Sequence, residues 1–221
     1  MKKKKVVIIH TSLVSFDYLK RLFEQIIPEA DVYNIVDDRL LAEVMENSAV
    51  TNSIIQRMKN HINSAENLGA DAILSQCSSM GPAVDILSKS VRTPILKIDL
   101  AMAEKAVAIG KKIAVVATVA STVKPSCRLI KESAKRTGKD VEISEELVDG
   151  ALDVLLYQGC EEKHNEMVLQ KIRFLEGKYD VIVLAQGSMT RLLPLLKNIK
   201  TPILTSPELG VRKMRNLLGL D

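Results

Sequence analysis

The stretch GADAILSQCSSMGPAVDILSKSVRTPIL, residues Gly69 to Leu96, decides the fold because the chain repeats it. Residues Gly177 to Leu204 read GKYDVIVLAQGSMTRLLPLLKNIKTPIL, with the same order of apolar run, polar break, helical stretch and final TPIL. Upstream, KKVVIIHT at Lys4 to Thr11 matches KKIAVVAT at Lys111 to Thr118, about 107 residues later. A repeat on this scale indicates a duplicated structural unit.

Short apolar runs in both copies predict β-strands, because they are rich in β-branched residues and are bounded by turn residues. The runs are VVII, AIL, IAVVA and VIVLA. Helical patterns lie between them, for example at residues 42–68, where apolar residues recur every three to five positions. Strands that alternate with helices predict parallel sheets covered on both faces. The predicted class is α/β, with two similar three-layer α/β/α units related by a pseudo-twofold axis.

The order of the repeats predicts where the chain passes from one unit to the other. We expect it to enter the second unit near Asp99 and to return after Leu204, which gives a first unit of residues 1–98 plus 206–221 and a second unit of residues 99–205. The last helix, PELGVRKMRNLLGL, then completes the first unit. Ligands bind beyond the carboxyl ends of parallel strands. Because the polar clusters follow the apolar runs, we expect an active-site cleft between the two units.

The composition is typical of a soluble globular protein, with 47% hydrophobic and 26% charged residues in 221. The net charge of +4 equals the four lysines at residues 2–5, which predicts a solvated basic terminus on an otherwise balanced chain. Neither a basic stripe for nucleic acid nor a signal peptide or membrane segment is indicated. Three widely spaced cysteines predict a reduced, cytoplasmic protein without a disulfide framework or structural metal.

Cys77 is the residue most suggestive of chemistry. It follows an apolar strand and precedes an expected helix start, where free N–H groups and the helix dipole would lower a thiol pKa and favour a bound anion. A small buried cysteine that ends a strand is the alternative interpretation. Cys127 and Cys160 have no counterpart in the other half, and packing or surface roles are predicted for both.

Hydroxyl groups gather in the segment ATVASTVKPS, at an expected helix start. Thr118, Ser121 and Thr122 can cap the free N–H groups of that helix, or can help them to hold a carboxylate or phosphate. His10 ends the first strand and is either a proton-transfer group or a polar strand end. Nucleotide binding and triad hydrolysis have no support, because the sequence contains no Walker motif, GxGxxG or Ser/His/Asp arrangement.

The motif pair DAILSQCSSMG and DVIVLAQGSM, together with the duplication, resembles the aspartate/glutamate/hydantoin racemase superfamily over essentially the whole chain. The resemblance implies an enzyme that needs no cofactor and that uses two cysteines, one from each unit, on opposite faces of a substrate α-carbon. Cys77 matches the first of these cysteines. Gln186 stands in the register of the second, and a glutamine amide cannot shuttle protons near neutral pH.

The resemblance also implies roles for individual residues. Cys77 is the expected catalytic residue, no metal is expected, and the expected partner is a small carboxylate substrate such as an amino acid or hydantoin. A homodimer is a possible assembly. The residues expected to bind the substrate are His10, Thr11, Ser12, Ser78, Ser79, Thr118, Ser121, Thr122, Gln186, Gly187 and Ser188.

Three functions remain open at the level of sequence. Racemisation or epimerisation at the α-carbon is the first. One-sided decarboxylation or isomerisation of a small mono- or dicarboxylic acid is the second, and it fits Gln186 better: arylmalonate decarboxylases look like racemases with one cysteine, and maleate isomerases use a cysteine nucleophile. A non-catalytic protein that binds small acids is the third.

Overall fold

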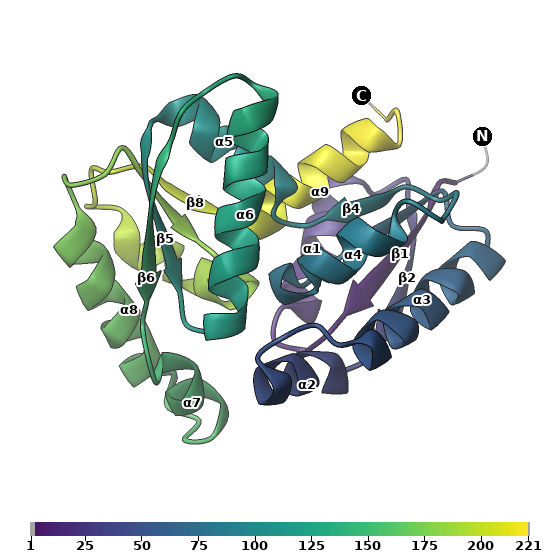
Figure 1. Ribbon diagram of the computed structural model, residues 1–221, viewed down its shortest axis with the longest axis horizontal. Coiled ribbons are helices and arrows are strands. Elements are labelled where there is room, and N and C mark those ends of the chain that lie inside the picture. Colours follow the sequence, from purple (N-terminus) through teal and green to yellow (C-terminus); the bar gives the residue numbers. More distant parts are fainter. Residues whose placement is uncertain (1–2, 221) are drawn as a thin grey trace. The chain divides into compact units, whose positions relative to one another are not determined.

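The computed structural model describes residues 3–220, which form two compact units (Figure 1). Unit 1 comprises Met1–Leu100 and Pro207–Asp221, and unit 2 comprises Ala101–Ser206. Unit 2 is therefore one continuous segment of chain inserted into unit 1. Each unit has its own four-stranded sheet and its own hydrophobic core.

Unit 1 is built on a parallel sheet with the strand order β2-β1-β3-β4. Its strands are β1 (Lys5–His10), β2 (Asp31–Val36), β3 (Ala72–Ser75) and β4 (Ile95–Lys97). Its helices are α1 (Phe16–Ile26), α2 (Arg39–Asn47), α3 (Asn52–Asn67), the short 3₁₀ helix η1 (Ser78–Met80), α4 (Gly81–Leu87) and α9 (Ser206–Leu217).

The central strand β1 shows how unit 1 buries both faces of its sheet. Val6 and Ile8 pack into a core formed with α1 and α9. The alternate residues Val7 and Ile9 pack into a second core, formed with α3 and α4. Successive side chains of a strand point to opposite faces, so a run of apolar residues is what a sheet covered on both sides requires. Unit 1 has three layers as a result.

Unit 2 repeats this plan with the strand order β6-β5-β7-β8, again all parallel. Its strands are β5 (Lys112–Ala117), β6 (Glu142–Leu147), β7 (Val181–Leu184) and β8 (Ile203–Thr205). Its helices are α5 (Leu100–Ile109), α6 (Ala120–Arg136), α7 (Ala151–Leu156), α8 (Glu161–Leu175) and the 3₁₀ helix η2 (Gly187–Leu196). Helix α6 packs on β5 and β6, and α8 packs on the core of the other face (Figure 1).

Each unit contains a similar polar contact at the amino ends of its strands. Asp71 Oδ2 accepts a hydrogen bond from the backbone N–H of Lys5 at 2.8 Å, and Asp180 Oδ2 accepts one from Lys112 at 2.9 Å. Each aspartate directly precedes the third strand of its sheet. Shared strand order and shared contacts of this kind confirm the predicted duplicated α/β fold.

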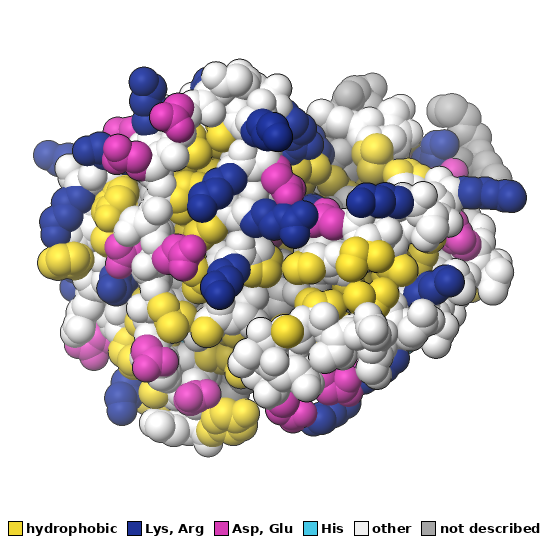
Figure 2. Space-filling model, viewed as in Figure 1, with side chains coloured by type: hydrophobic (Ala, Val, Ile, Leu, Met, Phe, Trp, Pro, Cys, Tyr) yellow, Lys and Arg dark blue, Asp and Glu magenta, His cyan; other side chains and the backbone are white. Residues whose placement is uncertain are grey.

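The surface corrects one expectation about the basic terminus. Lys2 lies outside the described residues. Lys4 Nζ lies 3.6 Å from Asp71 Oδ1, and Lys5 Nζ donates to the carbonyl of Leu68 at 2.6 Å, so these two lysines are tied to the fold rather than simply solvated. Over the face shown in Figure 2, acidic and basic side chains are interspersed. Within residues 3–220 there is no helix of the length and apolarity needed to cross a membrane.

Helix α9 completes the core of unit 1 through a close backbone approach. Val211, Met214 and Leu218 lie in the core that α1 and β1 also line. At Gly210 the helix comes close to the backbone of Ile98, directly after β4. An added Cβ would lie 2.5 Å from the carbonyl oxygen of Ile98. Only glycine fits this contact, because the blocking atom belongs to the backbone and cannot rotate away.

We therefore expect the substitution Gly210→Ala to destabilise the protein by about 2 kcal/mol, although alanine favours helices over glycine by about 1 kcal/mol. Urea unfolding measures the effect. The control is Leu217→Ala on the same helix, where the side chain is 46% exposed, and it should change the free energy of unfolding by about 0.5 kcal/mol at most. Equal stability of the Gly210→Ala variant and the parent would contradict the close docking of α9.

Candidate active site

Cys77 lies where the chain leaves the sheet of unit 1. Strand β3 ends at Ser75, and Cys77 adopts an extended conformation with φ −114° and ψ 120° before η1 begins. Its carbonyl accepts the N–H of Met80 at 3.1 Å, which closes the first turn. The buried apolar strand thus gives way to small polar residues at its carboxyl end, and this change sets the thiol at the edge of the sheet.

The sulfur of Cys77 is surrounded by hydrogen-bond donors. The hydroxyls of Thr11 and Ser79 and the backbone N–H groups of Ser79 and Met80 donate to Sγ, and each of them lowers the thiol pKa. Cys77 is half-buried by its accessible surface, yet desolvation of its sulfur has the larger effect and raises the pKa of the thiol above its ordinary value. The prediction that the helix start lowers this pKa is therefore wrong in its net direction. The resting group is a neutral thiol whose thiolate, once formed, would find four donors in place.

Ser78, the residue after Cys77, contacts an acid that was not among the predicted site residues. Its side chain hydrogen-bonds the carboxyl group of Asp99, which lies just beyond β4 and is 3% exposed. Burial raises the pKa of the Asp99 carboxyl and favours its neutral form. The signal in the sequence is an acid directly after the segment TPILKI, at the carboxyl end of an expected parallel strand.

His10 lies at the end of β1 and is fully buried. Its Nε2 bonds Asn34 Oδ1 at 2.8 Å, and its ring packs against that of Phe16 of α1 in a tilted arrangement, with the ring centroids 5.1 Å apart. Burial lowers the pKa of His10, so the ring is neutral at neutral pH. These contacts lie on the α1 side of the sheet, whereas Cys77 packs against the core that α3 and α4 cover. They favour the interpretation of His10 as a polar strand end.

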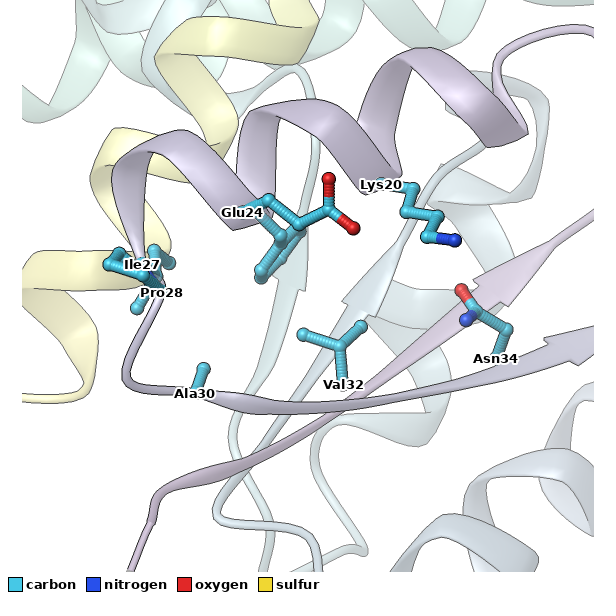
Figure 3. A pocket seen from close by; sticks show the side chains of 8 residues that line it. Lys20, Glu24, Ile27, Pro28, Ala30, Val32 and Asn34 are labelled. Carbon is cyan, nitrogen blue, oxygen red and sulfur yellow. The ribbon is translucent and has the colours of Figure 1, made fainter.

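A small cavity lies beside this histidine, between α1 and β2. Lys20 and Glu24 on α1 and Val32 and Asn34 on β2 border it, as Figure 3 shows. Its volume is about 210 Å³. Asn34, which lines the cavity, links it to the predicted site residue His10 through their hydrogen bond. Thr11 and Ser12, which follow His10, are buried and half-buried respectively.

Gln186 is the equivalent of Cys77 in unit 2. Ser75 pairs with Ile9 in the first sheet, Leu184 pairs with Val116 in the second, and Cys77 and Gln186 each lie two residues beyond. The backbone of Gln186 is similar, with φ −117° and ψ 140°.

The side-chain partner is also repeated. Thr11 donates to Cys77 Sγ. Its counterpart Thr118 donates through its backbone N–H to Gln186 Oε1 at 2.9 Å and through its hydroxyl to the same atom at 3.4 Å. In the described part of the chain, Gln186 Nε2 is buried without a hydrogen-bond partner. Unit 2 therefore presents an amide group where unit 1 presents a thiol.

The hydroxyl cluster of unit 2 differs from the predicted cap. Helix α6 begins after Val119, and within residues 3–220 no side chain at that position caps it. Thr118 is buried and turned to Gln186, while Ser121 and Thr122 lie inside the first turn of the helix. The capping interpretation is wrong for Thr118, because the N-cap residue of α6 is Val119 and Thr118 instead donates to Gln186.

Gly187 and Ser188 open the helix η2 and are half-buried. The carbonyl of Ser188 accepts a hydrogen bond from Arg191 Nε at 3.0 Å. Arg191 also forms an ion pair with Glu161 of α8 at 2.9 Å, which ties the start of η2 to that helix. The strand-end segment of unit 2 is thus held on both sides, by Thr118 and by α8.

The other two thiols have different surroundings. Cys127 is buried inside α6, where burial, aided by the negative charge of Glu145, raises its pKa to about 11. Cys160 is half-buried at the residue before α8. Among the residues that the structure describes, no three histidine, cysteine or acidic side chains come together in a way that could hold a metal ion.

The comparison with family models agrees with this arrangement. The model described as Asp/Glu/hydantoin racemase matches residues 6–214. The chain belongs to that family. The match spans both units and so confirms the resemblance that the motifs around Cys77 and Gln186 predict. A racemase-like enzyme, an isomerase in class, is the functional assignment that this membership supports.

Solved structures of the racemase family share the fold at low sequence identity. A glutamate racemase isoform from Bacillus anthracis superposes with a TM-score of 0.74 at 14% identity, covering 99% of this chain and 83% of the other. An aspartate racemase from Picrophilus torridus gives 0.71 at 18%, with coverage of 98% and 94%. An allantoin racemase from Klebsiella pneumoniae gives 0.68 at 16%, with coverage of 98% and 88%. No curated protein sequence matches the chain.

The environment of Cys77 predicts the pH dependence of its reactivity. Only the thiolate is alkylated, and a raised pKa leaves less thiolate at every pH. In a Cys127→Ala/Cys160→Ala variant, we expect the rate of iodoacetamide alkylation to reach half its maximum above pH 9.0, the ordinary value for the group.

A Cys77→Ala/Cys160→Ala variant is the matched control, because Cys127 should then titrate near its pKa of about 11. Mass spectrometry of alkylated protein sampled over time measures both rates. A half-maximal rate for Cys77 below pH 9.0 would contradict the conclusion that burial outweighs the four donors.

Proposed function

We propose that this racemase-family protein moves a proton at the α-carbon of a small carboxylate through the thiol of Cys77, without a cofactor. The observation that carries the proposal is the set of four donors around Sγ, two hydroxyls and two backbone N–H groups. A sulfur that only filled space in a core would not need donors that stabilise its charged form. The donors favour a group that cycles between thiol and thiolate.

The thiolate would act as the base. The α C–H bond breaks, the proton forms the S–H bond of Cys77, and the electron pair moves into the carboxylate as an enediolate. The thiolate forms when Cys77 loses its proton to solvent, and the S–H group formed in the first step then returns a proton to the planar carbon, which restores the acid and the thiolate. The raised pKa helps this step, because a thiolate of higher proton affinity narrows the gap to the weakly acidic carbon. The enediolate charge needs preorganised donors, for which Ser78 and Ser79, next to Cys77, are the candidates.

The substrate class is an amino acid or a related small acid. Support comes from the family description and from the similar structures, whose titles name glutamate, aspartate and allantoin racemases. A panel of α-amino acids, hydantoins and ureido acids is therefore the first choice for assays.

One-sided chemistry is the second candidate, and Gln186 favours it. The position equivalent to Cys77 carries an amide whose oxygen already accepts from Thr118. That amide can orient a substrate oxygen but cannot exchange a proton near neutral pH. A decarboxylase or isomerase of a small mono- or dicarboxylic acid would need only the thiol of Cys77. Malonates and hydroxy acids complete the panel for this reason.

Incubation with this panel in D2O, followed by NMR, tests the proposal. We expect deuterium at the α-carbon of a substrate, and a loss of about 10²- to 10⁴-fold in kcat/KM for Cys77→Ala, the range for removal of a general acid or base. Cys127→Ala is the control and should leave turnover nearly intact, because that thiol is buried within α6.

The stereochemistry of the product separates the candidates. Deuterium in both stereoisomers indicates racemisation, while deuterium in one, or only after loss of carbon dioxide, indicates one-sided chemistry. Equal losses for the Cys77 and Cys127 variants would contradict the assignment of Cys77. Binding of a panel acid without any exchange would leave the non-catalytic binding protein as the better conclusion.

A second thiol at the equivalent position should change the stereochemical outcome. We expect Gln186→Cys to raise the ratio of inverted to retained product by about tenfold, because it introduces a proton-transfer group where the chain has an amide. Gln186→Ser is the control, since a hydroxyl is polar but too weak an acid to replace the thiol. If both variants gave the same ratio, the proposed importance of position 186 would be refuted.

A further inference from the structure

We infer that Asp99 is a positioning residue for the Cys77 thiol, and that it acts through the hydroxyl of Ser78. The inference deepens the proposed function, since it matters for catalysis only if Cys77 is the reactive group. Within residues 3–220, the groups that donate to Sγ belong to Thr11, Ser79 and Met80, and Asp99 is not among them. Its influence has to pass through the turn that carries those donors.

The side chains of Asp99 and Ser78 are in direct contact. Asp99 and Ser78 are 3% and 9% exposed, and the Ser78 side chain hydrogen-bonds the Asp99 carboxyl group. Among residues 3–220, Asp99 Oδ1 is buried and has no partner. A buried acid is costly, so a structural gain must offset it.

The turn that Ser78 begins has few hydrogen bonds of its own. Helix η1 has three residues, and its backbone bonds are those from Met80 to the Cys77 carbonyl and from Gly81 to the Ser78 carbonyl. Such short 3₁₀ segments have poor hydrogen-bond geometry and depend on outside contacts. Ser78 immediately precedes the two residues whose N–H groups donate to Sγ. Holding Ser78 therefore also holds the direction of those two donors.

Unit 2 lacks both residues of this pair. In unit 2 the equivalent of Ser78 is Gly187, which has no hydroxyl. Asp99 lies two residues beyond β4, and the residue two places beyond β8 is Pro207, which has no carboxyl. Both members of the pair are thus replaced where glutamine replaces cysteine. The serine and the aspartate occur together with the thiol, as expected if they serve it.

The charges around Asp99 are compatible with this role. Lys97 Nζ lies 2.7 Å from Asp85 Oδ1, so the positive charge nearest to Asp99 is already paired. Lys97 favours the ionised form of Asp99 and Asp85 opposes it, while burial favours the neutral form most strongly. A neutral carboxyl can accept from Ser78 without repelling a thiolate at Cys77. The part that Asp99 plays is then that of a hydrogen-bond acceptor rather than of a charge.

Alkylation of Cys77 in the Cys127→Ala/Cys160→Ala background tests the inference without requiring turnover. We expect Asp99→Ala and Ser78→Ala each to slow iodoacetamide alkylation at pH 8 by about fivefold, the factor for one hydrogen bond of about 1 kcal/mol, and to move the pH profile upward. The double variant should be no slower than either single variant, because the two residues act as one unit.

Asp99→Asn is the matched conservative variant. Its amide oxygen can still accept from Ser78, so its alkylation profile should match that of the parent. Thermal unfolding of every variant separates positioning from stability, since a purely structural role would lower Tm and leave the pH profile unmoved.

Three results would overturn the inference: additive effects in the double variant, an unchanged pH profile in both alanine variants, or an Asp99→Asn profile that departs from the parent like that of Asp99→Ala. Faster alkylation in the alanine variants would also refute it, because it would mean that the carboxyl acts through charge or by shielding the thiol. A failure of the proposed function gives a different pattern: the alkylation results hold, but Cys77→Ala retains turnover.

Discussion

The structure depends on one constraint, the burial of a parallel sheet on both faces. Residues Val6 to Ile9 of β1 alternate between two cores, so the interior of this strand is apolar and polar groups gather where the strand ends. The thiol of unit 1 and the amide of unit 2 both lie two residues beyond the last paired position of the third strand. The groups that we propose for the chemistry therefore lie in short segments that follow the strands.

At Cys77 two opposing effects meet, and their sizes differ. Four donors favour the thiolate, yet desolvation outweighs them and keeps the group protonated at rest. The same burial makes the thiolate a stronger base once it forms, and the four donors lower the free energy needed to form it. Gln186 keeps the threonine contact without the acid–base chemistry. The two units thus preserve a geometry while differing in what that geometry can do.

Much of this arrangement could be predicted from residue pattern alone. The repeated order of strands and polar breaks predicts two parallel sheets, and the match of Gln186 to Cys77 follows from counting along the repeat. The direction of the Cys77 pKa could not be predicted, because it depends on how completely the surrounding elements exclude water. The contact of Asp99 with Ser78 was missed for a related reason: it joins strand ends 21 residues apart, and nothing in the local sequence of either residue indicates its partner. The sequence leaves two roles open for Thr118, a helix cap and an anion ligand, and neither indicates its bonds to the distant Gln186.

The insertion of unit 2 into unit 1 has a consequence for biosynthesis. The core beneath α1 includes Val211, Met214 and Leu218, which the ribosome adds only after the whole of unit 2. Unit 2 is a continuous segment and can acquire its contacts as it emerges, whereas one side of the first sheet is covered only by α1 until α9 arrives. The unit that carries Cys77 is therefore begun first and completed last, and its apolar surface is the one exposed to chaperones in the interval.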